Sequence, residues 1–215
     1  MNEQEIEIIN SLTRTQKIKN FTKKNIKFII LIIIVILLSI FGFFVLKEIN
    51  DRKKVEISNL YKNSIINFSD TNKAQIIKNL TGIIKKKDET YSPLALYFLI
   101  ENNLISSKEE VNLYFDIIIN ELKLNKTIKD LNIYKKALYN SDFSSEEEIL
   151  NIINPLIKEN NIWRSHSLYL IGEYYYSKNQ KQKAKEFFEK IISINNTNPE
   201  IKLEAQKRLQ RDFSE

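Results

Sequence analysis

The sequence contains no cysteine, only three glycines and three prolines, and a single histidine. Without cysteine the chain has no disulfide, no thiolate metal site and no cysteine nucleophile. So few glycines and prolines argue against a sheet with many hairpins, because hairpin turns depend on these residues. The glycines stand far apart, at positions 42, 82 and 172, so they cannot form a phosphate-binding or dinucleotide-binding loop. We therefore expect no cofactor.

Long apolar runs are also scarce, and the only one is Phe28–Leu46, which reads FIILIIIVILLSIFGFFVL. It continues for nineteen residues without a charge. As a helix it spans about 28 Å, close to the roughly 30 Å hydrocarbon core of a bilayer. A helix buried in a soluble core is the alternative, but no other uniformly apolar segment offers a layer to bury it. The run predicts a single-pass membrane helix.

Basic residues predict how this helix is oriented. Within fifteen residues of the run, six basic residues precede it and four follow it. Since flanks rich in Lys and Arg stay in the cytoplasm, residues 1–27 are expected there and residues 47–215 on the outer side of the membrane. A cleaved signal peptide is the alternative, but its apolar region is usually about 7–15 residues long and precedes small residues. The C-terminal end of the run and the residues after it read FGFFVLKEIN, without the small residues of a cleavage site, which predicts a retained anchor.

The net charge of +6 does not indicate a nucleic-acid partner. Half of this charge lies in residues 1–27, whereas residues 47–215 carry 27 basic and 24 acidic side chains. No basic stripe interleaved with aromatic residues stands out among them. We therefore expect no nucleic-acid binding.

The remaining sequence predicts an all-α fold. Apolar residues recur with a period near 3.6, and no segment alternates convincingly with period two. Short loops separate the segments, which favours antiparallel neighbours in a helical-hairpin array of about nine helices. The first helix is expected to continue the membrane helix through residues 47–67. The clearest of the others are Trp163–Ser177, Lys181–Ile194 and Pro199–Arg211.

Serine, asparagine and proline predict several helix boundaries. Ser92-Pro93 and Asn198-Pro199 each resemble an N-cap followed by a proline in the first turn. Ser106 and Ser107 offer alternative capping boxes, each with a glutamate three residues later. Asn154-Pro155 is expected to kink or end its helix, because proline lacks the amide hydrogen and its ring clashes with the preceding turn.

One pair of helices near the C-terminus follows the tetratricopeptide pattern, a repeat of about 34 residues. Gly172 and Ala184 lack bulk, so the two helices can approach closely, while Tyr175 and Phe188 fill the groove between them. The full signature consists of Leu168, Ile171, Gly172, Tyr175, Ala184, Phe188 and Ile191. Upstream segments do not keep this spacing, so the predicted array is degenerate.

A block of the form N-x-W-R-x-[HS]-S-x-x-L-x-G overlaps this repeat. It is occupied loosely by Asn160, Trp163, Arg164, His166, Ser167, Leu170 and Gly172. Together with the basic tail, the single anchor and the degenerate array, the block resembles the membrane-anchored tetratricopeptide-like family of the YfgM type, in its alphaproteobacterial form. The segment Tyr91-Ser-Pro-Leu-Ala is similar to the third helix of that family.

The resemblance implies a bacterial inner-membrane protein whose C-terminal domain lies in the periplasm. The described role of that family is an ancillary subunit of the SecYEG translocon that works with periplasmic chaperones. Translocon subunits or such chaperones are therefore the partners that the resemblance implies.

Residues 163–176 also supply the candidate interaction side chains. Trp163 and Arg164 either plug the junction with the preceding helix pair and form a local salt bridge, or belong to an interaction surface. Tyr174 and Tyr176 flank the inward-facing Tyr175, which leaves them partly exposed in a surface of the kind favoured at binding hot spots, or buried against the neighbouring helix.

No residue suggests chemistry. His166 has no second histidine or cysteine with which to hold a metal, so a packing or surface role is expected. We predict no catalytic, metal-binding or cofactor-binding residue.

The sequence as a whole predicts a membrane-anchored scaffold that binds proteins and is not an enzyme, since helical arrays offer extended surfaces. No Gly-, Pro- or Ser-rich spacer precedes residue 47, so the array is expected close to the bilayer, where translocon partners would meet it. An adaptor for envelope assembly or cell division is one alternative. A membrane-anchored enzyme with a cryptic site is the other.

Overall fold

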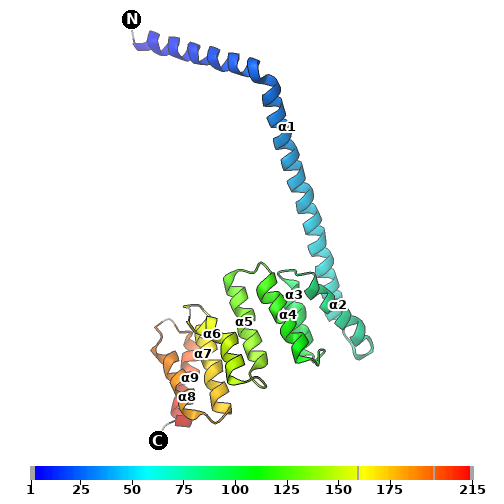
Figure 1. Cartoon of the computed structure of the whole chain (residues 1–215), viewed down its shortest axis with the longest axis vertical. Helices are drawn as coiled ribbons and strands as arrows, with labels where there is room; N and C mark the ends of the chain where they lie inside the picture. The colour runs from blue at the N-terminus through cyan, green and yellow to red at the C-terminus, as the bar shows by residue number, and fades with distance from the viewer. Residues whose placement is uncertain (1–2, 159, 196, 214–215) are drawn as a thin grey trace. The chain divides into compact units, whose positions relative to one another are not determined.

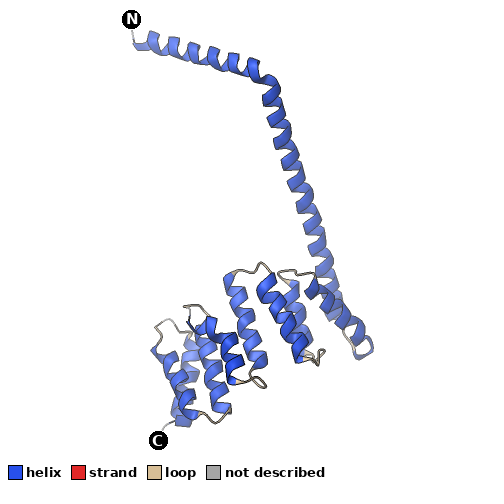
Figure 2. Cartoon of the chain, in the orientation of Figure 1, coloured by secondary structure: helices blue, strands red, loops and turns tan. Residues whose placement is uncertain are grey.

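A computed structural model describes the backbone of residues 3–158, 160–195 and 197–213, and side chains from residue 13 onward except 14, 15 and 18 in α1. The chain divides into two compact units, Met1–Glu56 and Ile57–Glu215. All regular secondary structure of the described residues is helical, which confirms the predicted fold class (Figure 2). The elements are, in chain order (Figure 1), α1 (Glu3–Ile66), η1 (Asp70–Asn72), α2 (Lys73–Lys85), α3 (Tyr91–Glu101), α4 (Lys108–Glu121), α5 (Lys126–Asn140), α6 (Glu146–Lys158), α7 (Arg164–Ser177), α8 (Lys181–Ser193) and α9 (Pro199–Phe213).

The first unit consists of the N-terminal part of α1, which is interrupted once. Asn25 departs from helical backbone angles, with φ −112° and ψ 17°. Its Nδ2 donates to the Phe21 carbonyl at 3.0 Å and so satisfies a backbone acceptor at the interruption.

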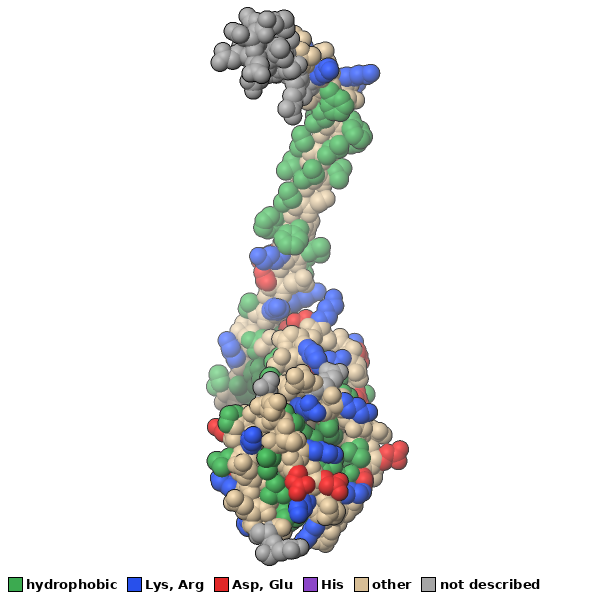
Figure 3. Space-filling model, turned by 90° about the vertical axis from the view of Figure 1, so that its left-hand side faces the viewer, with side chains coloured by type: hydrophobic (Ala, Val, Ile, Leu, Met, Phe, Trp, Pro, Cys, Tyr) green, Lys and Arg blue, Asp and Glu red, His purple; other side chains and the backbone are tan. Residues whose placement is uncertain are grey.

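Beyond Asn25, α1 presents apolar side chains to all sides. None of the side chains of residues 28–46 is buried. Figure 3 shows them as a hydrophobic band with Lys and Arg at both ends. Within the described residues, α1 contains the one helix that is long and apolar enough to cross a membrane, judged by length and composition. Such a surface requires an apolar environment.

The second unit contains two apolar cores. The N-terminal core joins the end of α1 to α2, α3 and α4, with Leu80, Leu96 and Phe115 among its most buried members. The C-terminal core joins α6, α7, α8 and α9 to a single buried apolar residue of α5, Ala137. Each helix thus buries its apolar face mainly against the helices that adjoin it in sequence.

Helix α5 lies between the two cores, and most of its buried side chains are polar. Its buried residues other than Ala137 are Asp130, Asn132 and Asn140. Asn140 and Asn112 of α4 exchange two amide hydrogen bonds, of 2.8 and 3.0 Å. These bonds satisfy groups that would otherwise be costly to bury.

Side-chain caps begin several of the helices. Ser107 Oγ accepts from the Glu110 amide at 3.1 Å, so the second of the two alternative serines caps α4. Asn198 Oδ1 accepts from the amides of Glu200 and Ile201 at the start of α9, in line with the predicted N-cap.

Ser92 is not an N-cap, which corrects the prediction for α3. The helix begins one residue earlier, and Asp88 Oδ1 accepts from the amides of Thr90 and Tyr91 instead. Ser92 is fully buried, and its hydroxyl donates to the Ile83 carbonyl at the end of α2 at 3.1 Å. Ser92 therefore joins two consecutive helices.

Pro155 does not end its helix, since α6 continues to Lys158. Leu156, the next residue, is buried in the C-terminal core together with Ile149 and Ile153. Burial of that last turn offsets the hydrogen bond that proline cannot make.

Helices α7 and α8 approach each other closely at Gly172. A Cβ atom added at Gly172 would lie 2.7 Å from Cε1 of Phe188, closer than real Cβ contacts allow. Phe188 and Ala184 are fully buried. Glycine at position 172 is thus required by the ring that packs on it.

We expect Gly172→Ala to lower the free energy of unfolding by about 1–3 kcal/mol, because the added methyl group must displace the Phe188 ring. Gly82→Ala is the matched control, since a Cβ there meets nothing within 4 Å. In the interior of α2 it should raise that free energy by about 0.5–1 kcal/mol. Denaturant unfolding of the purified chain, followed by helical circular dichroism, measures both. Equal stability of the two variants would contradict the close approach.

Candidate protein-binding groove

A groove runs between α3 and α5 in the N-terminal half of the array. It consists of two hollows, of about 210 and about 280 Å³, that share Tyr97. The first hollow is lined by Tyr97, Ile100, Glu101, Phe115, Lys135, Leu138 and Tyr139. The second is lined by Glu89, Thr90, Pro93, Leu94, Tyr97, Ile128 and Leu131. We call the whole feature the α3–α5 groove.

Tyr97 is the fixed centre of this groove. Its hydroxyl donates to Oδ1 of the buried Asn132 at 2.7 Å, and Asn132 in turn donates to the Ile128 carbonyl at 2.8 Å. Lys135 Nζ lies 3.9 Å from the centroid of the Tyr97 ring. Burial raises the pKa of the Tyr97 hydroxyl, so it stays a neutral donor at physiological pH.

The walls of the groove are apolar and accessible. Leu94, Ile128 and Leu138 are among the exposed large hydrophobic residues of the second unit. Both hollows also contain charged side chains, with Glu89 in one, Glu101 in the other, and Lys135 over the Tyr97 ring between them. An apolar trough with a few charges suits an amphipathic peptide segment, because apolar area drives burial and the charges select orientation.

The predicted repeat residues lie together in the C-terminal half of the array. All seven residues are buried. Gly172 lies next to the C-terminal core, and the other six belong to it: Leu168, Ile171, Tyr175, Ala184, Phe188 and Ile191. Tyr175 also donates its hydroxyl to Glu146 of α6 at 2.9 Å, which links this helix pair to the preceding one.

Trp163 lies at the junction between α5 and α7. Its ring stacks on Tyr134 with centroids 5.7 Å apart, and its Nε1 donates to the Thr127 carbonyl at 3.1 Å. His166 contacts the same two rings edge-on or tilted. Arg164 has a buried Nε without a hydrogen-bond partner among the described residues. These side chains pack the junction.

Tyr174 is buried and not partly exposed, since only 5% of its surface is accessible to solvent. Its hydroxyl donates to the Ser144 carbonyl at 3.1 Å, because the α5–α6 loop folds over this end of α7. Tyr176 is half-buried, with the Arg208 guanidinium 4.6 Å from its ring centroid. Neither tyrosine forms an open aromatic surface.

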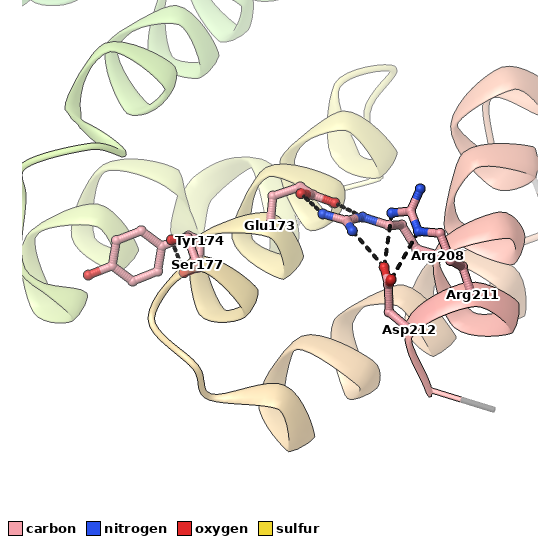
Figure 4. A network of polar contacts seen from close by, with 6 residues as sticks. All are labelled: Glu173, Tyr174, Ser177, Arg208, Arg211 and Asp212. Atoms are coloured by element: carbon pink, nitrogen blue, oxygen red, sulfur yellow. Dashed lines mark hydrogen bonds and ion pairs between the residues drawn. The ribbon is translucent and has the colours of Figure 1, made fainter. Parts of the chain in front are cut away.

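Arg208 connects α9 to α7 through a charged network (Figure 4). It forms a two-pronged ion pair with Glu173 and a bond of 2.6 Å from Nη1 to Asp212. Arg211 donates to the same carboxylate, with Nε 2.9 Å from Asp212 Oδ1. The two guanidinium groups lower the pKa of Asp212 to about 2. The network fastens the last helix to the array.

The comparisons with known proteins agree with this arrangement over part of the chain. Residues 165–198 match the family model of the tetratricopeptide repeat. The match covers α7, α8 and the connection to α9. No curated protein matches the chain, and no solved structure does. A tetratricopeptide repeat in an all-helical array indicates a scaffold for protein binding.

The α3–α5 groove is missed by sequence reasoning. Leu131 and Leu138 belong to the same apolar pattern as the inward-facing Ala137, so the pattern alone assigns all of them to the core. The available signal is the stripe Ile128, Leu131, Lys135 and Leu138, at spacings of three and four residues on one side of α5. Among the described residues no cluster of acidic and histidine side chains could hold a metal.

The charged network predicts an acid-sensitive contribution to stability. The pKa of Asp212 is about 2 in the folded chain against an ordinary 3.8, so its stabilisation is complete above the ordinary value and is lost as the pH falls toward 2. We therefore expect Asp212→Asn to lower the melting temperature at neutral pH. The difference from the parent should shrink toward zero as the pH falls to about 2. Thermal melts across this pH range measure it.

The control is Asp142→Asn, at an exposed carboxylate of the α5–α6 loop that forms no ion pair with a described residue. It should leave the melting temperature unchanged throughout. A difference for Asp212→Asn that is the same at pH 2 and at pH 7 would contradict the role of the network.

Proposed function

We propose that this protein is a membrane-anchored scaffold that binds segments of other proteins in the α3–α5 groove. The observation that carries the proposal is the groove itself, an accessible apolar trough in an array that includes a tetratricopeptide repeat. Residues 28–46 serve as a retained single-pass anchor in the bacterial inner membrane. Residues 1–27 lie in the cytoplasm and residues 47–215 in the periplasm, in accord with the distribution of basic residues.

The groove is suited to a short amphipathic segment. The α3 wall is about 11 residues of helix, or roughly 16 Å, which matches about three helical turns or five extended residues. Apolar side chains of the segment would contact Leu94, Ile128 and Leu138. A carboxylate of the segment would lie near Lys135, and a basic group near Glu89.

Translocon subunits or periplasmic chaperones are the partners that we propose. The resemblance to the YfgM-type family supports this choice. An adaptor of envelope assembly would present a different partner set through the same groove. The protein has no reaction of its own in either case.

Photo-crosslinking in native membranes tests the partner. We expect a crosslinker at Leu138 to capture translocon subunits or envelope chaperones, and a crosslinker at Leu113 to capture much less. Leu113 is likewise exposed but lies on α4 outside the groove. Capture of envelope-assembly or division proteins at Leu138 would replace the translocon assignment and keep the groove. Equal capture at both positions would exclude the groove as the binding site.

The Leu138→Asp variant tests the apolar wall directly. Loss of one buried leucine from the interface is worth about 1.5–3 kcal/mol, so with the crosslinker at Leu94 of the same groove we expect capture of the same partner to fall at least about tenfold. Leu203→Asp on α9 is the matched control, because Leu203 is 50% exposed and Leu138 is 49% exposed. Unchanged capture by Leu138→Asp, with helical content intact, would contradict the proposal.

The absence of cysteine permits a clean test of topology. Asn20→Cys and Gln182→Cys each introduce the only thiol of the chain, at exposed positions. A membrane-impermeant maleimide applied to intact spheroplasts should label Gln182→Cys and spare Asn20→Cys until the cells are lysed. The opposite pattern would reverse the orientation of the anchor. Release of the labelled domain from the membrane would instead show that residues 28–46 are cleaved.

A further inference from the structure

The segment directly before the apolar run, residues 8–27, is basic and contains no acidic residue. It carries six basic residues, namely Arg14, Lys17, Lys19, Lys23, Lys24 and Lys27. No acidic residue occurs between Glu7 and Glu48. The five lysines are exposed, and none forms an ion pair with another described side chain of α1. Their charge is therefore available to an external anion.

The other end of the run differs in this respect. Four basic residues, Lys47, Arg52, Lys53 and Lys54, alternate there with Glu48, Asp51 and Glu56. Arg52 Nε is paired with Glu48 Oε1 at 2.7 Å. The two ends of one apolar helix thus differ in net charge, and only the N-terminal end lacks carboxylates of its own.

Helical spacing places the aromatic ring of Phe21 between two of these exposed lysines. Phe21 is 65% exposed, and Lys17 and Lys24 lie four residues before it and three after it, on the same face. Asn25 ends this helical stretch, and its side chain takes up the Phe21 carbonyl. The face ends where the apolar helix begins.

We propose that this lysine–phenylalanine face binds anionic lipid headgroups at the membrane surface, and the proposal rests on the anchoring of residues 28–46 in the bilayer. The ammonium groups of Lys17 and Lys24 contact phosphate oxygens, while the Phe21 ring enters the boundary between headgroups and acyl chains. The interruption at Asn25 allows the face to leave the direction of the membrane helix and lie on the surface. The tail is thereby a second, lipid-dependent attachment.

The test uses the full chain in vesicles of phosphatidylcholine with increasing fractions of phosphatidylglycerol. A nitroxide at Asn20→Cys, the only thiol, reports whether the tail is held at the surface. We expect its mobility to fall as phosphatidylglycerol increases. Raising the ionic strength from about 0.1 to about 1 M, which shortens the Debye length from about 10 to about 3 Å, should restore it.

Two paired variants locate the effect. Lys17→Gln with Lys24→Gln should weaken the surface association about 25-fold, or about fivefold for each lysine. Lys53→Gln with Lys54→Gln removes the same charge at the other end of the run and should leave the association unchanged. Equal weakening by both pairs, or no dependence on phosphatidylglycerol, would overturn the proposal.

Two further measurements test whether the tail binds free anions instead of lipid and whether residues 28–46 anchor the chain. Inorganic phosphate added to pure phosphatidylcholine vesicles should not immobilise the label, and immobilisation by it would show a site for free anions instead of lipid. Alkaline carbonate extraction of the same vesicles checks the anchor. Extraction of the chain would refute the anchoring of residues 28–46, whereas a retained chain indifferent to phosphatidylglycerol would refute the lipid contact alone.

Discussion

Nearest-neighbour burial is the constraint on which the second unit depends. Each of its helices has one apolar face and little else to stabilise it, so it folds only against the helices beside it. The array therefore needs small residues where two helices cross, and Gly172 beneath the Phe188 ring is such a crossing. At the last described helix, Arg208 adds a polar contact, since it joins α9 to α7 through an ion pair with Glu173.

The binding groove arises from the same constraint. Helices that are next but one in sequence meet over less of their length than adjacent helices do. At the C-terminal end Arg208 and Phe213 close the space between α7 and α9 over Tyr176. Between α3 and α5, Tyr97 bridges the two helices through Asn132 and Lys135, and the space on either side of its ring stays open. One side chain thus divides the trough and supports both of its walls.

The helices were predictable because periodicity and caps are properties of neighbouring residues. Ser107 and Asn198 cap their helices as expected, since each acts on amides two or three residues away. The N-cap predicted at Ser92 is wrong, and the sequence does not decide between the alternatives at Pro155 and Tyr174, because distant segments determine their environments. The groove could not be foreseen for the same reason, since its leucines have the composition of core residues and only the tertiary arrangement leaves them accessible.

The polar character of α5 has a consequence for cooperativity. The two apolar cores meet at α5 across the polar side chains of Asn112, Asn132 and Asn140 and across Ile133, which packs against both cores. Because amide pairs exchange for water at small net cost, the polar part of this boundary couples the two halves of the array less strongly than apolar burial does. The groove belongs to the seam between those halves, and a bound segment that contacts both α3 and α5 would couple them into a single folding unit.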